Sequence, residues 1–138
     1  MAVTDYPTVG TVLSAENGQV VLAPLNTSYQ LHLRCDAIDA DTVGHRVRGT
    51  IRLPARKVMT VSTGGNFIAP IFGQPRIVQG RLMYLDQRQM VLRAGTHIVV
   101  DLPAQDSALD LTRGPLQQGA LVNVAVGGPA TFTPEKTG

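Results

Sequence analysis

The chain repeats part of its own sequence, and this repeat constrains the fold more than any other feature. Residues 10–22 align with residues 80–92 without a gap, and Gly, Gln, Val and Leu coincide in the two blocks. Residues 44–55 align in turn with residues 119–130, where a glycine, a valine and a Pro-Ala pair coincide. Because the two blocks recur in the same order, the sequence predicts an internal duplication of one small structural unit.

Each repeat is expected to consist of five short strands. The 138 residues include 14 Gly and 9 Pro, with many Val and Thr, and this composition favours short strands over helices. A tight hairpin is predicted at residues 16–18, because an Asn-Gly pair tolerates the positive φ of such a turn. In the first repeat we expect strands near residues 8–14, 19–24, 28–35, 45–53 and 56–62.

The third of these strands alternates strictly between apolar and polar residues. Leu31 and Leu33 lie in one phase, together with Tyr29 and Cys35, while the other phase is polar. This alternation is typical of a strand with one face in the core and one in solvent.

Three strands, an irregular connection and then two strands are the order expected for an OB-like barrel, with an SH3-like barrel as the rival. The connection spans residues 36–43 in the first repeat and the longer segment 103–118 in the second, where residues 107–111 are expected to form a short helix. The fold class is therefore all-β. We expect two tandem five-stranded small barrels, over residues 1–62 and 76–138.

The connector between the barrels, residues 63–75, is rich in Gly and Pro but too apolar for a solvated tether. We expect it to pack between the two barrels as interdomain core. The alternative is that it contacts another subunit or a ligand. The apolar side chains that would form this interface are Phe67, Ile68, Ile71 and Phe72.

Basic residues are concentrated in the middle of the chain. Residues 42–93 hold nine Arg and Lys residues against one acid, whereas both ends are acidic. Arg46, Arg48 and Arg52 alternate with apolar residues, so they share one strand face at spacings of about 7 Å or more. Arg56 and Lys57 follow them. The aligned positions of the second repeat hold Leu121, Asn123 and Gly127, so the fold does not demand the arginines.

These five basic residues are the predicted anion-binding site, with single-stranded nucleic acid as the expected ligand class. The rival interpretation is a solvated face balanced by Asp36, Asp39 and Asp41, and an aromatic content of only 4% weakens the case for base stacking. The alternative function is an oligomeric assembly protein that uses the apolar connector and strand faces.

Catalytic and metal-binding patterns are not expected. His32 and Cys35 lie three residues apart, on opposite strand faces, and no second Cys completes a ligand set. The single Cys cannot form an internal disulfide, and no stretch approaches about 18 consecutive apolar residues. We therefore expect a cytoplasmic binding protein that is not an enzyme, without a cofactor, a metal or a membrane partner.

Overall fold

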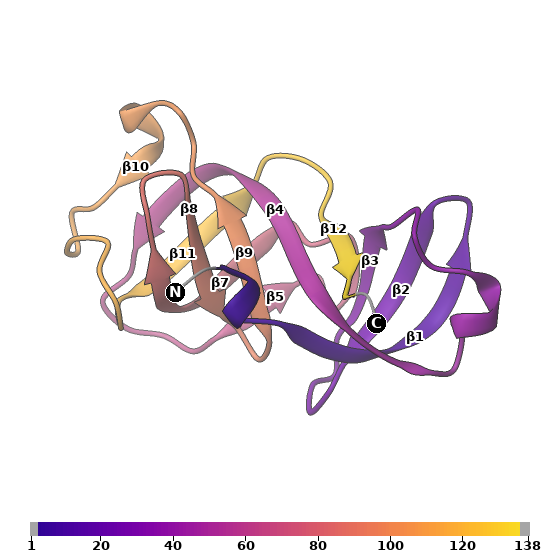
Figure 1. The fold of residues 1–138 in the computed structure, drawn as a ribbon. Coiled ribbons are helices and arrows are strands. Elements are labelled where there is room, and N and C mark those ends of the chain that lie inside the picture. Colours follow the sequence, from indigo (N-terminus) through magenta and orange to yellow (C-terminus); the bar gives the residue numbers. More distant parts are fainter. Residues whose placement is uncertain (1–2, 136–138) are drawn as a thin grey trace.

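The computed structural model describes residues 3–135, and strands make up most of its regular structure (Figure 1). Three short 3₁₀ turns are η1 (Val3–Asp5), η2 (Ala40–Thr42) and η3 (Asp106–Ala108). The strands are β1 (Thr8–Glu16), β2 (Gln19–Pro24), β3 (Gln30–Arg34), β4 (Arg46–Thr60), β5 (Phe67–Ala69), β6 (Phe72–Gly73), β7 (Ile77–Leu85), β8 (Gln89–Arg93), β9 (His97–Asp101), β10 (Leu109–Asp110), β11 (Leu121–Val126) and β12 (Thr131–Pro134). The all-β prediction is confirmed.

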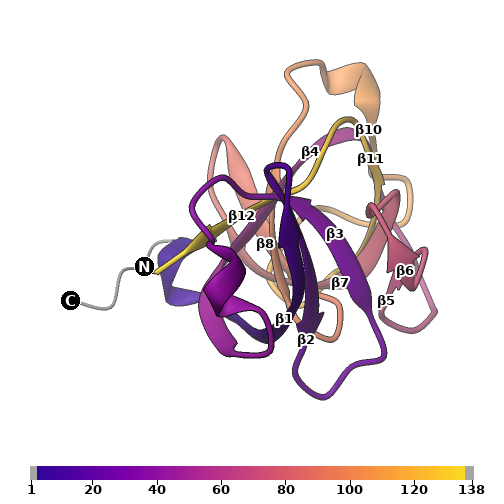
Figure 2. The ribbon, with the colours of Figure 1, turned by 90° about the vertical axis from the view of Figure 1, so that its right-hand side faces the viewer.

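Five strands pair in a ring, which we call the first ring. β1 pairs with β2, β2 with β3, β3 with β12, β12 with β4, and β4 with β1. Its closing strand, β12, comes from the C-terminal end of the chain and lies beside β3 and β4 (Figures 1 and 2). The contact between β3 and β12 is a single parallel pair, Arg34 with Thr131, so the ring is only partly closed there.

The pairings trace a second cycle through β4, β11, β7, β8 and β9, which we call the second ring. Both cycles pass through β4, which crosses from one lobe of the molecule to the other in Figure 1. All strands therefore belong to one mixed sheet.

The prediction of separate strands at residues 45–53 and 56–62 is wrong, because β4 is one continuous strand of 15 residues. Pro54 lies inside this strand, although proline cannot donate to a ladder. It lies where β4 changes partners: β12 pairs as far as Arg52, and β11 begins at Ala55. The Pro54 carbonyl still accepts the Gly127 N–H, at 2.8 Å.

The first strands of the two repeats have the same local geometry. β1 and β7 are both nine residues long, and each has an irregularity in register, between Val12 and Ser14 in β1 and between Leu82 and Tyr84 in β7. Gly44 and Gly119, which the sequence aligns, make equivalent hydrogen bonds. The Gly44 N–H donates to the Val12 carbonyl at 2.7 Å, and the Gly119 N–H donates to the Leu82 carbonyl at 2.8 Å.

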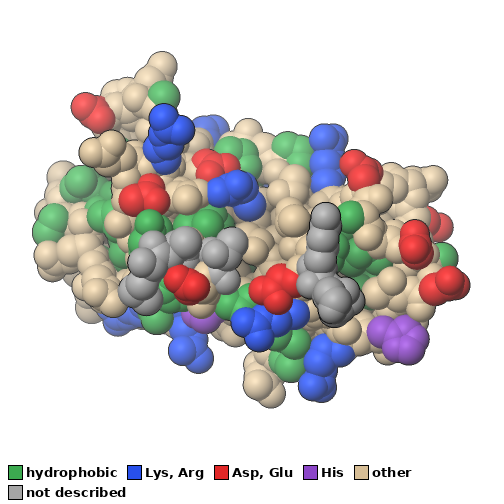
Figure 3. Space-filling model, viewed as in Figure 1, with side chains coloured by type: hydrophobic (Ala, Val, Ile, Leu, Met, Phe, Trp, Pro, Cys, Tyr) green, Lys and Arg blue, Asp and Glu red, His purple; other side chains and the backbone are tan. Residues whose placement is uncertain are grey.

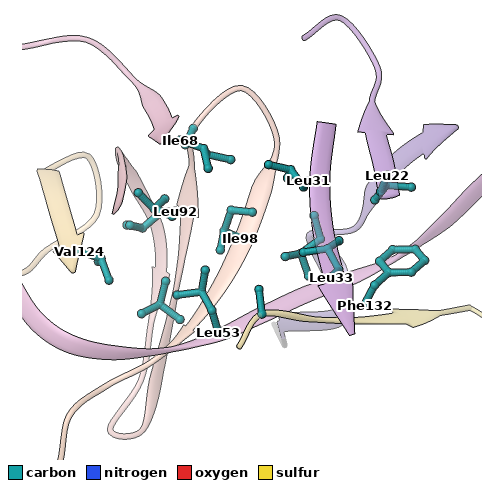
Figure 4. Packing of buried hydrophobic residues seen from close by; sticks show 14 of the residues in the cluster. Leu22, Leu31, Leu33, Leu53, Ile68, Leu92, Ile98, Val124 and Phe132 are labelled. Atoms are coloured by element: carbon teal, nitrogen blue, oxygen red, sulfur yellow. The ribbon is translucent and has the colours of Figure 1, made fainter. Parts of the chain in front are cut away.

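The core runs through both rings as one cluster (Figure 4). Leu31 and Leu33 are buried, and Tyr29 packs against the same cluster, as the alternation of this strand predicts. Leu53 of β4 lies between the residues of the two lobes in Figure 4. The two rings therefore share a core as well as a strand.

The two connections differ from expectation in detail. The expected helix at residues 107–111 is the 3₁₀ turn η3 followed by β10, which pairs in parallel with β4.

The connector 63–75 adds a short strand to each ring, since β5 pairs with β7 and β6 pairs with β3. Of its four large apolar side chains, only Ile68 is buried; Phe67, Ile71 and Phe72 are exposed, so the prediction that the segment is buried fails for these three.

Candidate binding site

The arginines of β4 lie on its outer face. Arg46, Arg48 and Arg52 are exposed, whereas Ile51 and Leu53 in the opposite phase are buried. This arrangement follows from the two-residue period of a strand, which sends alternate side chains to opposite faces. The three guanidinium groups therefore do not contribute to the core.

Two of these arginines form ion pairs with acids from the C-terminal half. The Arg48 Nε lies 3.2 Å from Glu135, and the Arg52 Nε lies 3.3 Å from Asp101. Arg52 also donates to the Gln89 side-chain oxygen. The paired side chains are 46–59% exposed, and such surface pairs contribute about 0–1 kcal/mol, so a ligand anion can replace the carboxylate at little cost.

The acids expected to balance the arginines are not their partners. Within residues 3–135, Asp36, Asp39 and Asp41 form no ion pair with the β4 arginines. Arg46 likewise has no carboxylate within ion-pair distance in this part of the chain. Internal pairing therefore accounts for Arg48 and Arg52 and leaves Arg46 available.

A groove of about 1030 Å³ lies beside the beginning of β4 and the end of β12. We call it the β12 groove. Two guanidinium groups and one carboxylate border a largely apolar lining, so it can hold a ligand with both anionic and apolar parts. Its lining residues are Val9, Ala37, Ile38, Thr42, Arg46, Val47, Arg48, Thr133, Pro134 and Glu135.

The five predicted site residues are not gathered in one place. Arg46 and Arg48 border the β12 groove, whereas Arg52 borders a second groove of about 560 Å³ with Arg88 and Asp101. Lys57 follows Arg56 on the part of β4 that pairs with β11. On the face shown in Figure 3, basic and acidic side chains are interspersed rather than collected into one basic patch.

The charge of Lys57 influences Asp110, an acidic residue of β10. The pKa of Asp110 is lowered, first by hydrogen bonds from the Thr112 hydroxyl and N–H and then by the charges of Lys57 and Arg113. Lys57 lines neither of the two grooves that Arg46, Arg48 and Arg52 border.

A smaller polar groove of about 230 Å³ lies at the β1–β2 turn and was missed from the sequence. Gln19, His32 and Arg34 line it, together with Gln74 of the connector. His32 and Arg34 were assigned to the solvated face of their strand. Local alternation gives that assignment correctly but does not show that Gln74 lies nearby.

Asp86 and Tyr84, whose pKa values are shifted, form hydrogen bonds at the turn between β7 and β8. The Asp86 carboxylate accepts the N–H groups of Arg88 and Gln89 at 2.8 and 2.9 Å, which lowers the pKa of Asp86. The Tyr84 hydroxyl donates to the same carboxylate at 2.9 Å, and this bond raises the pKa of Tyr84. Within residues 3–135, no three His, Cys, Asp or Glu side chains are grouped so that they could hold a metal ion.

No helix formed by residues 3–135 has the length and apolarity needed to cross a membrane. The chain matches no known family model, curated protein or solved structure. Among the described residues, Arg46 and Arg48 place two exposed guanidinium groups on the border of the β12 groove.

Proposed function

We propose that this chain is a non-enzymatic binding protein that holds an anionic macromolecule at Arg46 and Arg48. The observation that carries the proposal is the position of these two exposed guanidinium groups on the border of a large, mostly apolar groove. A guanidinium presents a planar fork of donors that matches phosphate and carboxylate oxygens. Single-stranded nucleic acid is the ligand class that the sequence suggests, and it is the first probe.

We further propose that both rings are OB-like barrels related by an internal duplication. Five strands in a partly open ring support the first part of this proposal. The second part is supported by the matched register irregularities of β1 and β7 and by the matched hydrogen bonds of Gly44 and Gly119. In this scheme β12 corresponds to the second half of β4. β12 follows the strands of the second repeat but completes the first ring, and the second half of β4 follows the strands of the first repeat but completes the second ring.

The test is a titration of a labelled dT oligonucleotide and of labelled polyglutamate with the protein at low and moderate salt, followed by fluorescence anisotropy. We expect a salt-dependent association with at least one probe. Replacing Arg46 and Arg48 by Gln together should reduce the salt slope for the oligonucleotide by about 1.4, at about 0.7 per phosphate contact. The matched control replaces two arginines exposed elsewhere, Arg93 and Arg113, by Gln.

If neither probe binds at low salt, the proposed function is wrong. It is also wrong if the control pair lowers affinity as much as the Arg46 and Arg48 pair, because binding would then depend on net charge alone.

Assembly remains a second candidate because large apolar side chains are exposed around the connector. Phe72 is 63% exposed and Ile71 is 50% exposed, and Phe67 and Ile77 are also exposed. Sedimentation at increasing protein concentration tests this candidate. Apolar self-association should persist or strengthen in sulfate salts, whereas binding of an anionic ligand weakens with salt.

A further inference from the structure

Within residues 3–135, one edge of β12 has no strand partner beside the β12 groove. β12 pairs with β4 from Thr131 to Pro134, but on its other side it pairs with β3 at Thr131 alone. The Glu135 N–H donates to the Arg48 carbonyl at 2.8 Å, so the backbone groups of Glu135 point toward β4. Along a strand, the N–H and C=O groups of successive residues point to opposite sides. The carbonyls of Phe132 and Pro134 therefore point away from β4, toward the unpaired edge.

The corresponding edge of the second ring is covered by the chain itself. Aligning Pro54 with Pro129 places Val58 and Met59 opposite Thr133 and Pro134. β10 pairs in parallel with Val58 and Met59, and Leu109 of β10 packs against the core.

The difference between the rings arises from the length of one connection. The second ring has the long connection 103–118, which supplies β10 and is held by a bond from the Thr60 hydroxyl to the Gly114 carbonyl at 2.9 Å. The first ring has the short connection 36–43, which contains only η2. Thr133 and Pro134, which line the β12 groove, are thus the counterparts of the two β4 residues that β10 covers in the second ring.

We propose that the β12 groove binds an extended peptide segment of a partner protein, in parallel with β12, through an aliphatic side chain flanked by acidic residues. This inference rests on the proposed function, since it names the anionic partner of the same site. The aliphatic side chain takes the position of Leu109 and packs against Val9 and Ile38. The carboxylates pair with Arg46 and Arg48, and peptide N–H groups donate to the free carbonyls of β12.

The lining of the groove favours a peptide over the other anionic ligands. None of the residues that line it is aromatic, and bases bound without sequence preference usually stack on aromatic side chains. A second copy pairing through its own β12 is disfavoured because Pro134 has no N–H to offer across a reciprocal edge. The arginines next to the groove complement acidic residues like Asp110, which follows Leu109 in β10.

The probe is a labelled synthetic peptide with the sequence of residues 105–112, Gln-Asp-Ser-Ala-Leu-Asp-Leu-Thr, titrated with the full chain. We expect saturable binding, and chemical-shift changes that map to Val9, Arg46 and Thr133. Arg46→Glu should weaken binding about tenfold or more, because a charge-assisted contact becomes a repulsion. Arg93→Glu makes the same change of net charge on an exposed residue outside the groove and should leave the affinity unchanged.

Two further variants test the apolar contact. Val9→Thr keeps the shape of the side chain and adds a hydroxyl, and it should weaken peptide binding severalfold while leaving the melting temperature close to that of the parent protein. A probe peptide in which the leucine that corresponds to Leu109 is replaced by Ser should lose most of its affinity for the parent protein.

The outcomes separate this inference from the proposed function. If the dT oligonucleotide binds through Arg46 and Arg48 and the peptide does not bind, the peptide inference is overturned and the proposed function stands. If neither the peptide, the oligonucleotide nor polyglutamate binds, both are overturned. Peptide binding that is insensitive to both Arg46→Glu and Val9→Thr also overturns the inference, because the contact would then lie elsewhere.

Discussion

Gly10 and Gly80 should be similarly intolerant of a side chain, because each lies against the backbone of the neighbouring strand. A methyl group at Gly10 would be 2.7 Å from the carbonyl oxygen of Ala23, in β2. A methyl group at Gly80 would meet the carbonyl oxygen of Arg93, in β8, even more closely. Backbone atoms in a paired strand cannot rotate away, so the strands of each hairpin must move apart.

The size of the effect follows from the cost of overpacking. Forcing an extra methyl group into a packed site costs about 1–3 kcal/mol. For a chain of 138 residues, the unfolding entropy of about 0.3 kcal/mol/K converts this cost into a fall in melting temperature of about 3–10 °C. Gly10→Ala and Gly80→Ala should each fall within this range, measured by thermal and urea unfolding.

Gly65→Ala is the control, because a methyl group there would meet no atom within 4 Å. Its free energy of unfolding should stay within about 0.5 kcal/mol of the parent value. If Gly10→Ala is as well tolerated as Gly65→Ala, the close packing of β1 against β2 is wrong. If only one of the two strand glycines is sensitive, the equivalence of β1 and β7 is wrong.

Two further predictions concern pH and the independence of the first ring. Hydrogen bonds from the Arg88 and Gln89 N–H groups lower the pKa of Asp86, so its contribution to stability is present above the ordinary aspartate pKa of about 3.9 and is lost as pH falls through the lowered value. Asp86→Asn should therefore cost more stability at pH 7 than at pH 2 in urea unfolding, and an equal cost at both would contradict this linkage. A fragment of residues 1–62 lacks β12 and should show no cooperative unfolding by circular dichroism, so a cooperative transition in that fragment would refute the structural role of β12.

Local features of the fold could be predicted because they depend on local chemistry. Asn17 and Gly18 have φ values of 54° and 73°, as the Asn-Gly hairpin signal requires. Leu31 and Leu33 are buried because strand alternation fixes their direction once the strand is recognised. The exposure of Arg46 and Arg48 follows from the same rule.

The partners of the strands could not be predicted in this way. Nothing near Pro54 indicates that β4 continues into a second ring, since the continuation depends on β11, which lies more than sixty residues later in the chain. The ion pair between Arg52 and Asp101 similarly depends on the parallel pairing of β4 with β9. Apolar character predicted burial of the connector, but of its four large apolar side chains only Ile68 is buried. Its strands β5 and β6 pair with different rings, which the local sequence does not indicate.

The positions aligned with Arg46 and Arg48 have structural roles in the second ring. In the second ring, Leu121 aligns with Arg46 and is buried. Asn123 aligns with Arg48, and its side-chain N–H donates to Gln79 at 3.0 Å. Both positions therefore serve structure in the ring whose edge is covered by β10, and both carry exposed charge in the ring whose edge is open. Within residues 3–135, the first ring therefore combines an open β12 edge with two exposed arginines at one groove, which is the combination that the proposed peptide ligand requires.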